Sequence, residues 1–214
     1  VEGTAGNTGI GLTLVGNSFG FKSVIVMPKT QSEEKKNELR SYGAELTLVP
    51  AVPYSNPKNY VRYSETLANN VQKNNRKKSV LWANQFDNLA NFQAHYETTG
   101  PEIWRDTKGK IDGFICAVGT GGTIAGIGSF LKKKNKKIKI GLVDPMGSAL
   151  HNFYTNGKLE SSGSSITEGI GQSRITENLQ KAVIDESFQA NDKDALKIVF
   201  NLLKEEGLVC LLYT

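Results

Sequence analysis

Two glycine-rich segments are the parts of this chain whose residue types and spacing are best suited to chemistry. The first opens the sequence as Gly3-Thr4-Ala5-Gly6-Asn7-Thr8-Gly9, and the second is Gly119-Thr120-Gly121-Gly122-Thr123. Each leads into small and apolar residues that predict a helix, over 10–16 and 124–131. A glycine-rich turn that enters a helix presents backbone N–H groups and the positive end of the helix dipole, and it therefore binds anions. Two such turns predict a ligand held at two anionic points, such as a phosphate and a carboxylate.

Neither segment fits the common nucleotide-binding patterns. A dinucleotide fingerprint that starts at Gly119 requires glycine at position 124, where the sequence has Ile124. The phosphate loop of nucleoside triphosphatases requires Gly-Lys followed by Ser or Thr, and neither segment contains Gly-Lys. The prediction that remains is a phosphate cradle of backbone N–H groups and threonine hydroxyls, without a lysine.

Six segments occur in an order that is typical of one enzyme family. They are Glu2–Gly11, Asn84-Gln85-Phe86, Thr98–Trp104, Val118–Thr123, Val143-Asp144-Pro145 and Glu168-Gly169-Ile170-Gly171. Together they resemble the fold-type II pyridoxal-phosphate enzymes, in the branch of cysteine synthase and cystathionine β-synthase. The resemblance implies pyridoxal 5′-phosphate as cofactor and a β-replacement on an O-activated serine. The simplest such reaction converts O-acetylserine and sulfide to cysteine and acetate.

The resemblance also implies a role for individual residues. The substrate-binding residues are Thr4, Ala5, Gly6, Asn7, Thr8 and Gln85, and the cofactor-binding residues are Asn7, Gly119, Thr120, Gly121, Gly122, Thr123 and Gly169. Consecutive N–H groups at a helix start suit an amino-acid carboxylate, to which Thr4 and Thr8 add hydroxyls. Asn7 matches an asparagine that hydrogen-bonds the 3′-oxygen of the cofactor ring. Ala5 stands where the family usually has serine, which removes one hydroxyl donor.

The residues alone leave simpler roles open for two of these side chains. The alternative for Asn7 is to cap the helix that follows it, and the alternative for Gln85 is to bond the backbone of its own loop. Gly169, Ile170 and Gly171 match a family loop that faces the cofactor, but by themselves they would be an ordinary turn.

Two functional segments of the family have no match. The lysine that forms the Schiff base lies upstream of the first glycine segment, and this sequence begins at Val1. The serine near the pyridine nitrogen is expected where the sequence has Val209-Cys210-Leu211-Leu212-Tyr213-Thr214. We therefore expect a chain that is incomplete at both ends and has no catalytic residue of its own. The alternatives are an enzyme like cystathionine β-synthase, which 143–148 also resembles, and a truncated, non-catalytic remnant.

Composition and charge indicate an ordinary globular protein. Hydrophobic residues make up 38% and charged residues 22% of the chain, with a net charge of +5. The lysines of 132–137 are interpreted as a solvated helix end, because no aromatic residues interleave them. Cys116, Cys210, His95 and His151 lack metal-ligand spacing, so no metal is expected. We expect a small-molecule substrate, no nucleic acid or membrane partner, a homodimer when intact, and a cytoplasmic location with the mitochondrion as the alternative.

Helices and strands alternate along the chain, which predicts an α/β fold with a doubly wound, mostly parallel sheet. The resemblance implies two doubly wound, three-layer domains, incomplete at both ends. We expect strands over 22–27, 44–49, 79–82, 111–118 and 138–143, and further helices over 32–42, 60–74, 91–104 and 192–206. Ser32 and Asp192 are the predicted caps of two helices. The resemblance places a smaller, mobile domain at 1–91 and a larger one at 92–214. Both glycine segments are predicted to follow parallel strands and to face one cleft.

Overall fold

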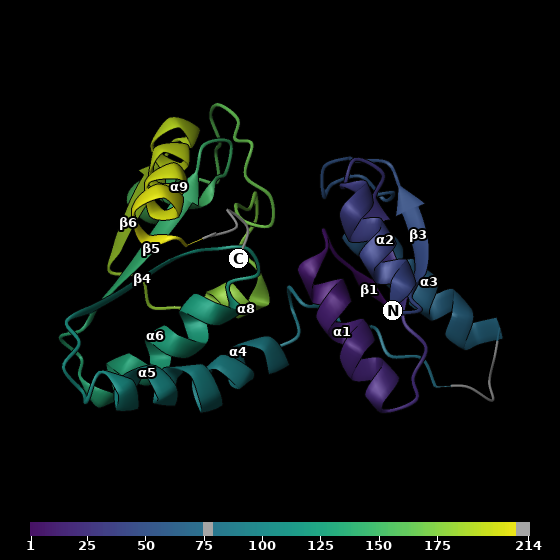
Figure 1. Cartoon of the computed structure of the whole chain (residues 1–214), viewed down its shortest axis with the longest axis horizontal. Helices are drawn as coiled ribbons and strands as arrows, with labels where there is room; N and C mark the ends of the chain where they lie inside the picture. Colours follow the sequence, from purple (N-terminus) through teal and green to yellow (C-terminus); the bar gives the residue numbers. More distant parts are fainter. Residues whose placement is uncertain (75–78, 209–214) are drawn as a thin grey trace. The chain divides into compact units, whose positions relative to one another are not determined.

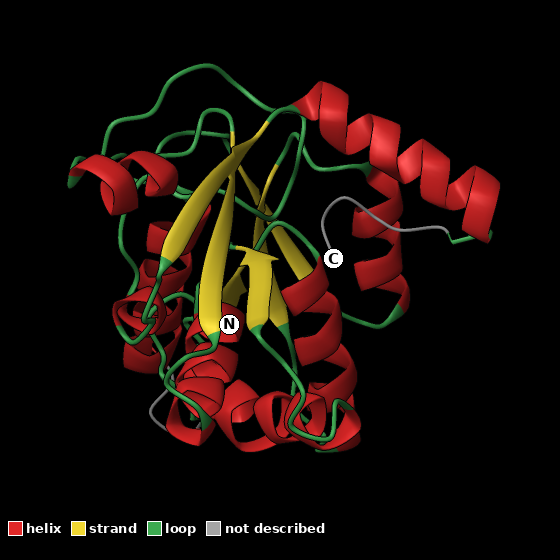
Figure 2. Ribbon diagram, turned by 90° about the vertical axis from the view of Figure 1, so that its left-hand side faces the viewer, coloured by secondary structure: helices red, strands yellow, loops and turns green. Residues whose placement is uncertain are grey.

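A computed structural model describes residues 1–74 and 79–208 of the chain. The chain divides into two compact units, Val1–Gln85 and Phe86–Thr214, each of them α/β with one parallel three-stranded sheet (Figure 1). Figure 2 shows the strands of these sheets with helices packed along them. None of the helices in the described ranges combines the length and the apolar character needed to cross a membrane. The division into domains at residue 91, which the resemblance implies, stays a prediction.

The first unit has helices on both faces of its sheet. Its elements are β1 (Glu2–Gly3), α1 (Asn7–Ser18), β2 (Val24–Pro28), α2 (Glu33–Ser41), β3 (Glu45–Val49) and α3 (Tyr60–Asn74), with the strands in the order β1-β2-β3. A Cβ added to Gly3 would lie 2.8 Å from Ser64 Oγ, so α3 covers that face of the sheet. Ile25 and Met27 point to the other face, where they pack with Leu39 of α2. This unit therefore forms the three layers that the sequence predicts.

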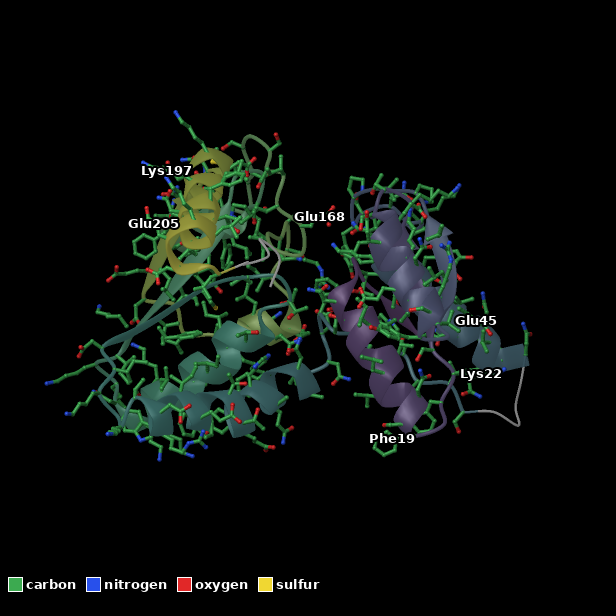
Figure 3. All side chains as sticks on the ribbon, viewed as in Figure 1. Phe19, Lys22, Glu45, Glu168, Lys197 and Glu205 are labelled. Atoms are coloured by element: carbon green, nitrogen blue, oxygen red, sulfur yellow. The ribbon has the colours of Figure 1, made fainter. Side chains whose placement is uncertain are left out.

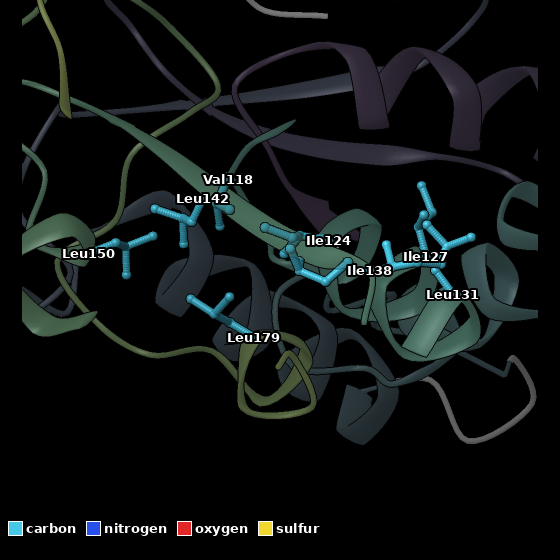
Figure 4. Close-up of a cluster of buried hydrophobic side chains, with 9 residues drawn as sticks. Val118, Ile124, Ile127, Leu131, Ile138, Leu142, Leu150 and Leu179 are labelled. Atoms are coloured by element: carbon cyan, nitrogen blue, oxygen red, sulfur yellow. The ribbon is translucent and has the colours of Figure 1, made fainter. Parts of the chain in front are cut away.

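The second unit has its core on one face of the sheet. Its elements are α4 (Ala90–Ala94), the π-helical turn η1 (His95–Thr99), α5 (Gly100–Asp106), β4 (Gly113–Ala117), α6 (Gly122–Lys134), β5 (Lys139–Pro145), α7 (Leu150–Asn156), α8 (Glu177–Gln180), β6 (Glu186–Ala190) and α9 (Asp192–Glu206). The strands lie in the order β4-β5-β6 and are parallel. Figure 4 shows the core, in which Leu142 of β5 and Ile124 and Leu131 of α6 are fully buried. On the opposite face, Ile115 is 55% exposed and Phe188 45%.

Most of the predicted elements are confirmed, because their boundaries are set by local signals. The helix predicted over 60–74 has those bounds in the structure, and Ser32 caps α2 by accepting a hydrogen bond from the Lys35 N–H at 3.4 Å. The strands predicted over 22–27, 44–49, 111–118 and 138–143 correspond to β2, β3, β4 and β5. Elements that the sequence analysis missed are the two-residue β1, α7, the short α8, and β6.

The strand predicted over 79–82 is wrong. This segment has no ladder; the amino group of Val1 donates to the Leu81 carbonyl at 2.7 Å, and the Ala83 N–H donates to the Val1 carbonyl at 3.0 Å. The indole Nε1 of Trp82 donates to Ser64 Oγ of α3 at 3.0 Å. The apolar residues are therefore held beside the start of the sheet by a few bonds rather than by a continuous strand pairing.

The helix predicted over 91–104 is interrupted by a π-helical turn, His95–Thr99. This turn packs on α6: a Cβ added to Gly126 would lie 2.5 Å from the Phe92 carbonyl and 2.7 Å from His95 Cβ. The two helix backbones thus approach each other closely at this point. A π-helical turn widens the helix locally and redirects its side chains, and such turns are frequent at functional sites.

The predicted cap of the last helix is also wrong by one residue. Asn191 caps α9, because its side-chain oxygen accepts a hydrogen bond from the Asp194 N–H at 3.0 Å. The carboxylate of Asp192 instead accepts bonds from Ser165 Oγ at 2.5 Å and from the Ile166 N–H at 3.0 Å. Asp192 is therefore used to hold the preceding long loop, a partner that no local pattern reveals.

Candidate active site

Each glycine segment follows the carboxyl end of a parallel strand and leads into a helix, as the sequence predicts. The first connects β1 to α1, and the second connects β4 to α6. Among the described residues, neither Gly6 nor Gly121 provides its helix with a side-chain cap, whereas α2, α3 and α9 receive one from Ser32, Asn59 and Asn191. Helices α4, α5 and α7 also lack a side-chain cap, so the distinguishing feature of α1 and α6 is a glycine-rich turn after a parallel strand, a setting in which backbone N–H groups can bind an anion. The prediction that both segments face one cleft remains a prediction.

The first segment is joined to Gln85, which lies far from it in the sequence. Thr8 donates its hydroxyl to Gln85 Oε1 at 2.6 Å, and Gln85 Nε2 donates to the Gly3 carbonyl at 3.1 Å. Thr4 is buried, and its Oγ1 accepts a bond from the Gly6 N–H at 3.1 Å. Ala5 is half-buried and Asn7 is exposed at the start of α1. The structure therefore brings Gln85 to the predicted substrate residues, with its amide held from both ends.

A buried carboxyl group that the sequence analysis did not single out supports this segment. Glu2 is only 2% exposed, and its Oε1 accepts a bond from the Gln85 N–H at 3.3 Å. Its other oxygen, Oε2, has no hydrogen-bond partner within the described part of the chain. Burial raises the pKa of Glu2 from 4.5 to about 7, an effect that the backbone hydrogen bonds from Gln85 and Asn84 only partly offset. A glutamate inside the first strand was the signal that could have revealed it.

The second segment has hydroxyls that are arranged to donate outward. Thr120 Oγ1 accepts a bond from Asn91 Nδ2 at 2.9 Å and a longer one from the Gly122 N–H at 3.4 Å. A hydroxyl that accepts from two donors keeps its own proton for a further acceptor, such as a phosphate oxygen. Asn91, which the sequence analysis used only as a boundary, is thus a part of this segment's support.

His95 links the π-helical turn to the same segment. Its Nε2 lies 3.1 Å from Thr123 Oγ1, and its Nδ1 lies 3.0 Å from Thr99 Oγ1. Burial lowers the pKa of His95, so the ring is neutral at pH 7, with one nitrogen donating and the other accepting. The sequence analysis assessed His95 only as a metal ligand and excluded that role. The π-helical turn that directs its ring toward Thr123 was not predictable from spacing.

Gly169 and Gly171 lie against the second segment, so the structure brings these predicted residues to Gly119–Thr123. A Cβ added to Gly119 would lie 2.3 Å from the Gly169 carbonyl, and the Gly171 N–H donates to the Val118 carbonyl at 2.8 Å. Gly121 has φ +87, a left-handed conformation that favours glycine. The segment thus has the shape of a phosphate cradle: an uncapped helix start, threonine hydroxyls, and glycines that side chains cannot replace.

The α/β fold and the two glycine segments are those expected of a pyridoxal-phosphate-dependent enzyme, and comparison with known proteins agrees. The family described as pyridoxal-phosphate-dependent enzyme matches residues 1–214. This chain belongs to that family.

Within this family, the chain is similar to the following individual proteins. The chain is 51% identical over 213 residues to cysteine synthase 1 of Neurospora crassa, covering 97% of this chain and 55% of the relative. It is 52% identical over 217 residues to cysteine synthase 1 of Emericella nidulans, covering 97% and 56%. A solved hydrogen sulfide-producing enzyme of Fusobacterium nucleatum matches with a TM-score of 0.81 and 35% identity, over 97% of this chain and 65% of that one. The chain thus spans little more than half the length of these curated relatives.

Proposed function

We propose that this chain is the part of a cysteine synthase that binds the α-carboxylate of O-acetylserine and the phosphate of the cofactor. The observation that carries the proposal is the 51% identity to a cysteine synthase across 97% of the chain. The glycine-rich helix starts at α1 and α6 support it because the reaction requires two anion-binding points. Pyridoxal phosphate, when bound, supplies an electron sink that stabilises negative charge on the substrate α-carbon.

Residues of the chain would bind and orient the substrate at the start of α1 and the cofactor at the start of α6. At the start of α1, backbone N–H groups would hold the substrate carboxylate. The Thr8 hydroxyl donates its single proton to Gln85 Oε1, so Thr8 would orient Gln85 rather than donate to the carboxylate. At the start of α6, the N–H groups and the hydroxyls of Thr120 and Thr123 would hold the cofactor phosphate. Holding the substrate at its carboxylate leaves its β-carbon, which bears the leaving group, to react with sulfide.

An assay of two reactions with the full-length protein that carries this sequence tests the proposal. Cysteine formation from O-acetylserine and sulfide is expected, without cystathionine formation from serine and homocysteine. Cystathionine as the main product would overturn the choice of substrate. No turnover of either pair by a cofactor-loaded protein would overturn the enzymatic proposal and favour a non-catalytic remnant. We further propose a homodimer in the cytoplasm, with the mitochondrion as the alternative, since one relative is named a putative mitochondrial cysteine synthase.

Replacing Asn7 tests whether this side chain serves the ligand or the helix. In the full-length protein, Asn7→Ala is expected to lower kcat/KM by about 10- to 100-fold, because a hydrogen bond to a charged or polar ligand group contributes about 1–3 kcal/mol. The melting temperature should change little, because Asn7 is exposed and lies in the first turn of α1, where water can replace a lost hydrogen bond.

The matched control is Asn17→Ala, near the other end of α1. Asn17 Nδ2 donates to the Tyr42 carbonyl at 2.7 Å, so this variant loses a bond of the fold and none at the helix start. It should keep its kcat/KM. A loss of stability in Asn7→Ala with unchanged turnover would show that Asn7 acts as a helix residue and nothing more.

A further inference from the structure

We infer that residues 169–176, which we call the strap, fix the direction of the N–H groups in the phosphate segment, and that Thr176 is a positioning residue for the cofactor phosphate. The inference rests on the proposed function in one respect, that Gly119–Thr123 binds a phosphate. The evidence for the strap is a set of hydrogen bonds and close approaches on the side of the segment away from the proposed phosphate.

Two carbonyl groups of the segment are held by the strap. The Val118 carbonyl accepts a bond from the Gly171 N–H at 2.8 Å, and the Thr120 carbonyl accepts one from Thr176 Oγ1 at 2.7 Å. In a planar trans peptide, the C=O of one residue and the N–H of the next point in opposite directions. The N–H groups of Gly119 and Gly121 therefore point away from the strap, toward the side on which an anion would bind.

The strap and the helix that follows it leave the segment no room to turn. At Gly119, a Cβ would lie 2.3 Å from the Gly169 carbonyl. At Gly121, a Cβ would lie 2.6 Å from Leu179 Cβ and 2.9 Å from the Leu179 backbone nitrogen. Leu179 is itself fully buried in the core of the unit. These approaches involve backbone or core atoms, so the peptides of the segment cannot rotate unless the strap moves as well.

The strap is in turn anchored at its far end. Thr176 is fully buried, and its Oγ1 also accepts a bond from the Leu179 N–H at 3.1 Å, which caps α8. Arg174 pairs with Asp87 through two bonds of 2.9 and 2.8 Å, and the Glu177 N–H donates to the same carboxylate at 3.0 Å. A bidentate arginine–carboxylate pair of this kind fixes the relative orientation of the two side chains as well as pairing their charges. The phosphate segment is thus held by hydrogen bonds that do not involve a ligand, and this preorganisation lowers the entropic cost of binding.

The test compares two ligands that differ only in the phosphate, in the full-length protein freed of cofactor. Thr176→Val keeps the side-chain volume but loses the hydroxyl, and it is expected to raise the Kd for pyridoxal phosphate about tenfold and to leave the Kd for pyridoxal unchanged. Thr176→Ser restores the hydroxyl and should restore the affinity. The ³¹P resonance of bound pyridoxal phosphate should shift in Thr176→Val and return in Thr176→Ser.

Asn191→Ala is the matched control, because it removes the cap of α9 in the same unit and touches no residue of the strap that the structure records. It should lower the melting temperature without changing either Kd. If Thr176→Val does not fold, Arg174→Gln breaks the anchor instead, and it should raise the Kd for pyridoxal phosphate alone by about threefold. An equal loss of affinity for pyridoxal phosphate and for pyridoxal would overturn the role of the strap. A loss of affinity that Asn191→Ala reproduces would overturn it as well. A wild-type protein that binds pyridoxal as tightly as its phosphate would overturn the phosphate assignment and the strap together.

Discussion

Gly119→Ala is expected to weaken the binding of pyridoxal phosphate by at least about 100-fold. The added Cβ would lie 2.3 Å from the Gly169 carbonyl, far inside van der Waals contact, and the opposing atom belongs to the backbone. Overpacking of this kind typically costs about 1–3 kcal/mol and shifts the backbone. The shift would displace N–H groups that must stay within hydrogen-bond reach of the phosphate, so several bonds weaken at once.

Gly113→Ala is the control for this variant, since Gly113 lies at the start of β4, the strand that leads into the same segment. A Cβ at that position would lie 3.4 Å from the Lys139 carbonyl, which is ordinary contact. Titration of the cofactor-free protein with pyridoxal phosphate, followed by fluorescence, should show an unchanged Kd for Gly113→Ala. A Gly119→Ala protein with the wild-type Kd would mean that the phosphate binds elsewhere.

The elements that sequence reasoning placed well are those whose signals are local. The amphipathic pattern and the absence of breakers define α3 over Tyr60–Asn74, and a serine before two acidic residues starts α2. The glycine segments were equally visible, because a turn that enters a helix start needs glycine for its own backbone. Their position after parallel strands follows from the alternation of strands and helices.

The contacts that sequence reasoning missed join residues across long separations. Thr8 and Gln85 are 77 residues apart, and Thr120 and Thr176 are 56 apart, yet each pair shares a hydrogen bond. No periodicity or spacing encodes such a pairing, since it depends on which loops the fold brings together. The packing of the π-helical turn at His95 is a further case, because the turn lies against Gly126 of α6, which is distant from it in the sequence.

The exposure of apolar side chains also depends on how the chain folds, and the sequence alone does not reveal it. Phe19 at the end of α1 is 69% exposed and stacks on Phe21, with ring centres 6.0 Å apart (Figure 3). Sequence patterns identify such residues as apolar but do not say which of them the folded chain will cover. The exposed Ile115 and Phe188 of the second sheet belong to the same group.

Glu2→Gln is expected to remove a pH dependence of stability of about 3 kcal/mol from the first unit. Because the pKa of Glu2 is raised from 4.5 to about 7 on folding, the folded state binds this proton more tightly than the unfolded state does. The free energy of unfolding is therefore highest below pH 4.5, falls as the pH rises from 4.5 to about 7, and stays about 3 kcal/mol lower above that range. Glutamine resembles the protonated carboxyl, so its variant should keep the higher stability at every pH.

Urea unfolding at about pH 5 and about pH 8 measures this effect. The chain has two tryptophans, and in a Trp104→Phe background the fluorescence of Trp82 reports on the first unit alone. The informative quantity is the difference between Glu2→Gln and its parent, because every other group that titrates in this range is present in both proteins. Glu45→Gln removes an exposed carboxyl from the same sheet (Figure 3) and should follow the parent at both pH values. If the difference between Glu2→Gln and the parent were the same at both, Glu2 would not titrate between these pH values, and the pKa of about 7 would be refuted.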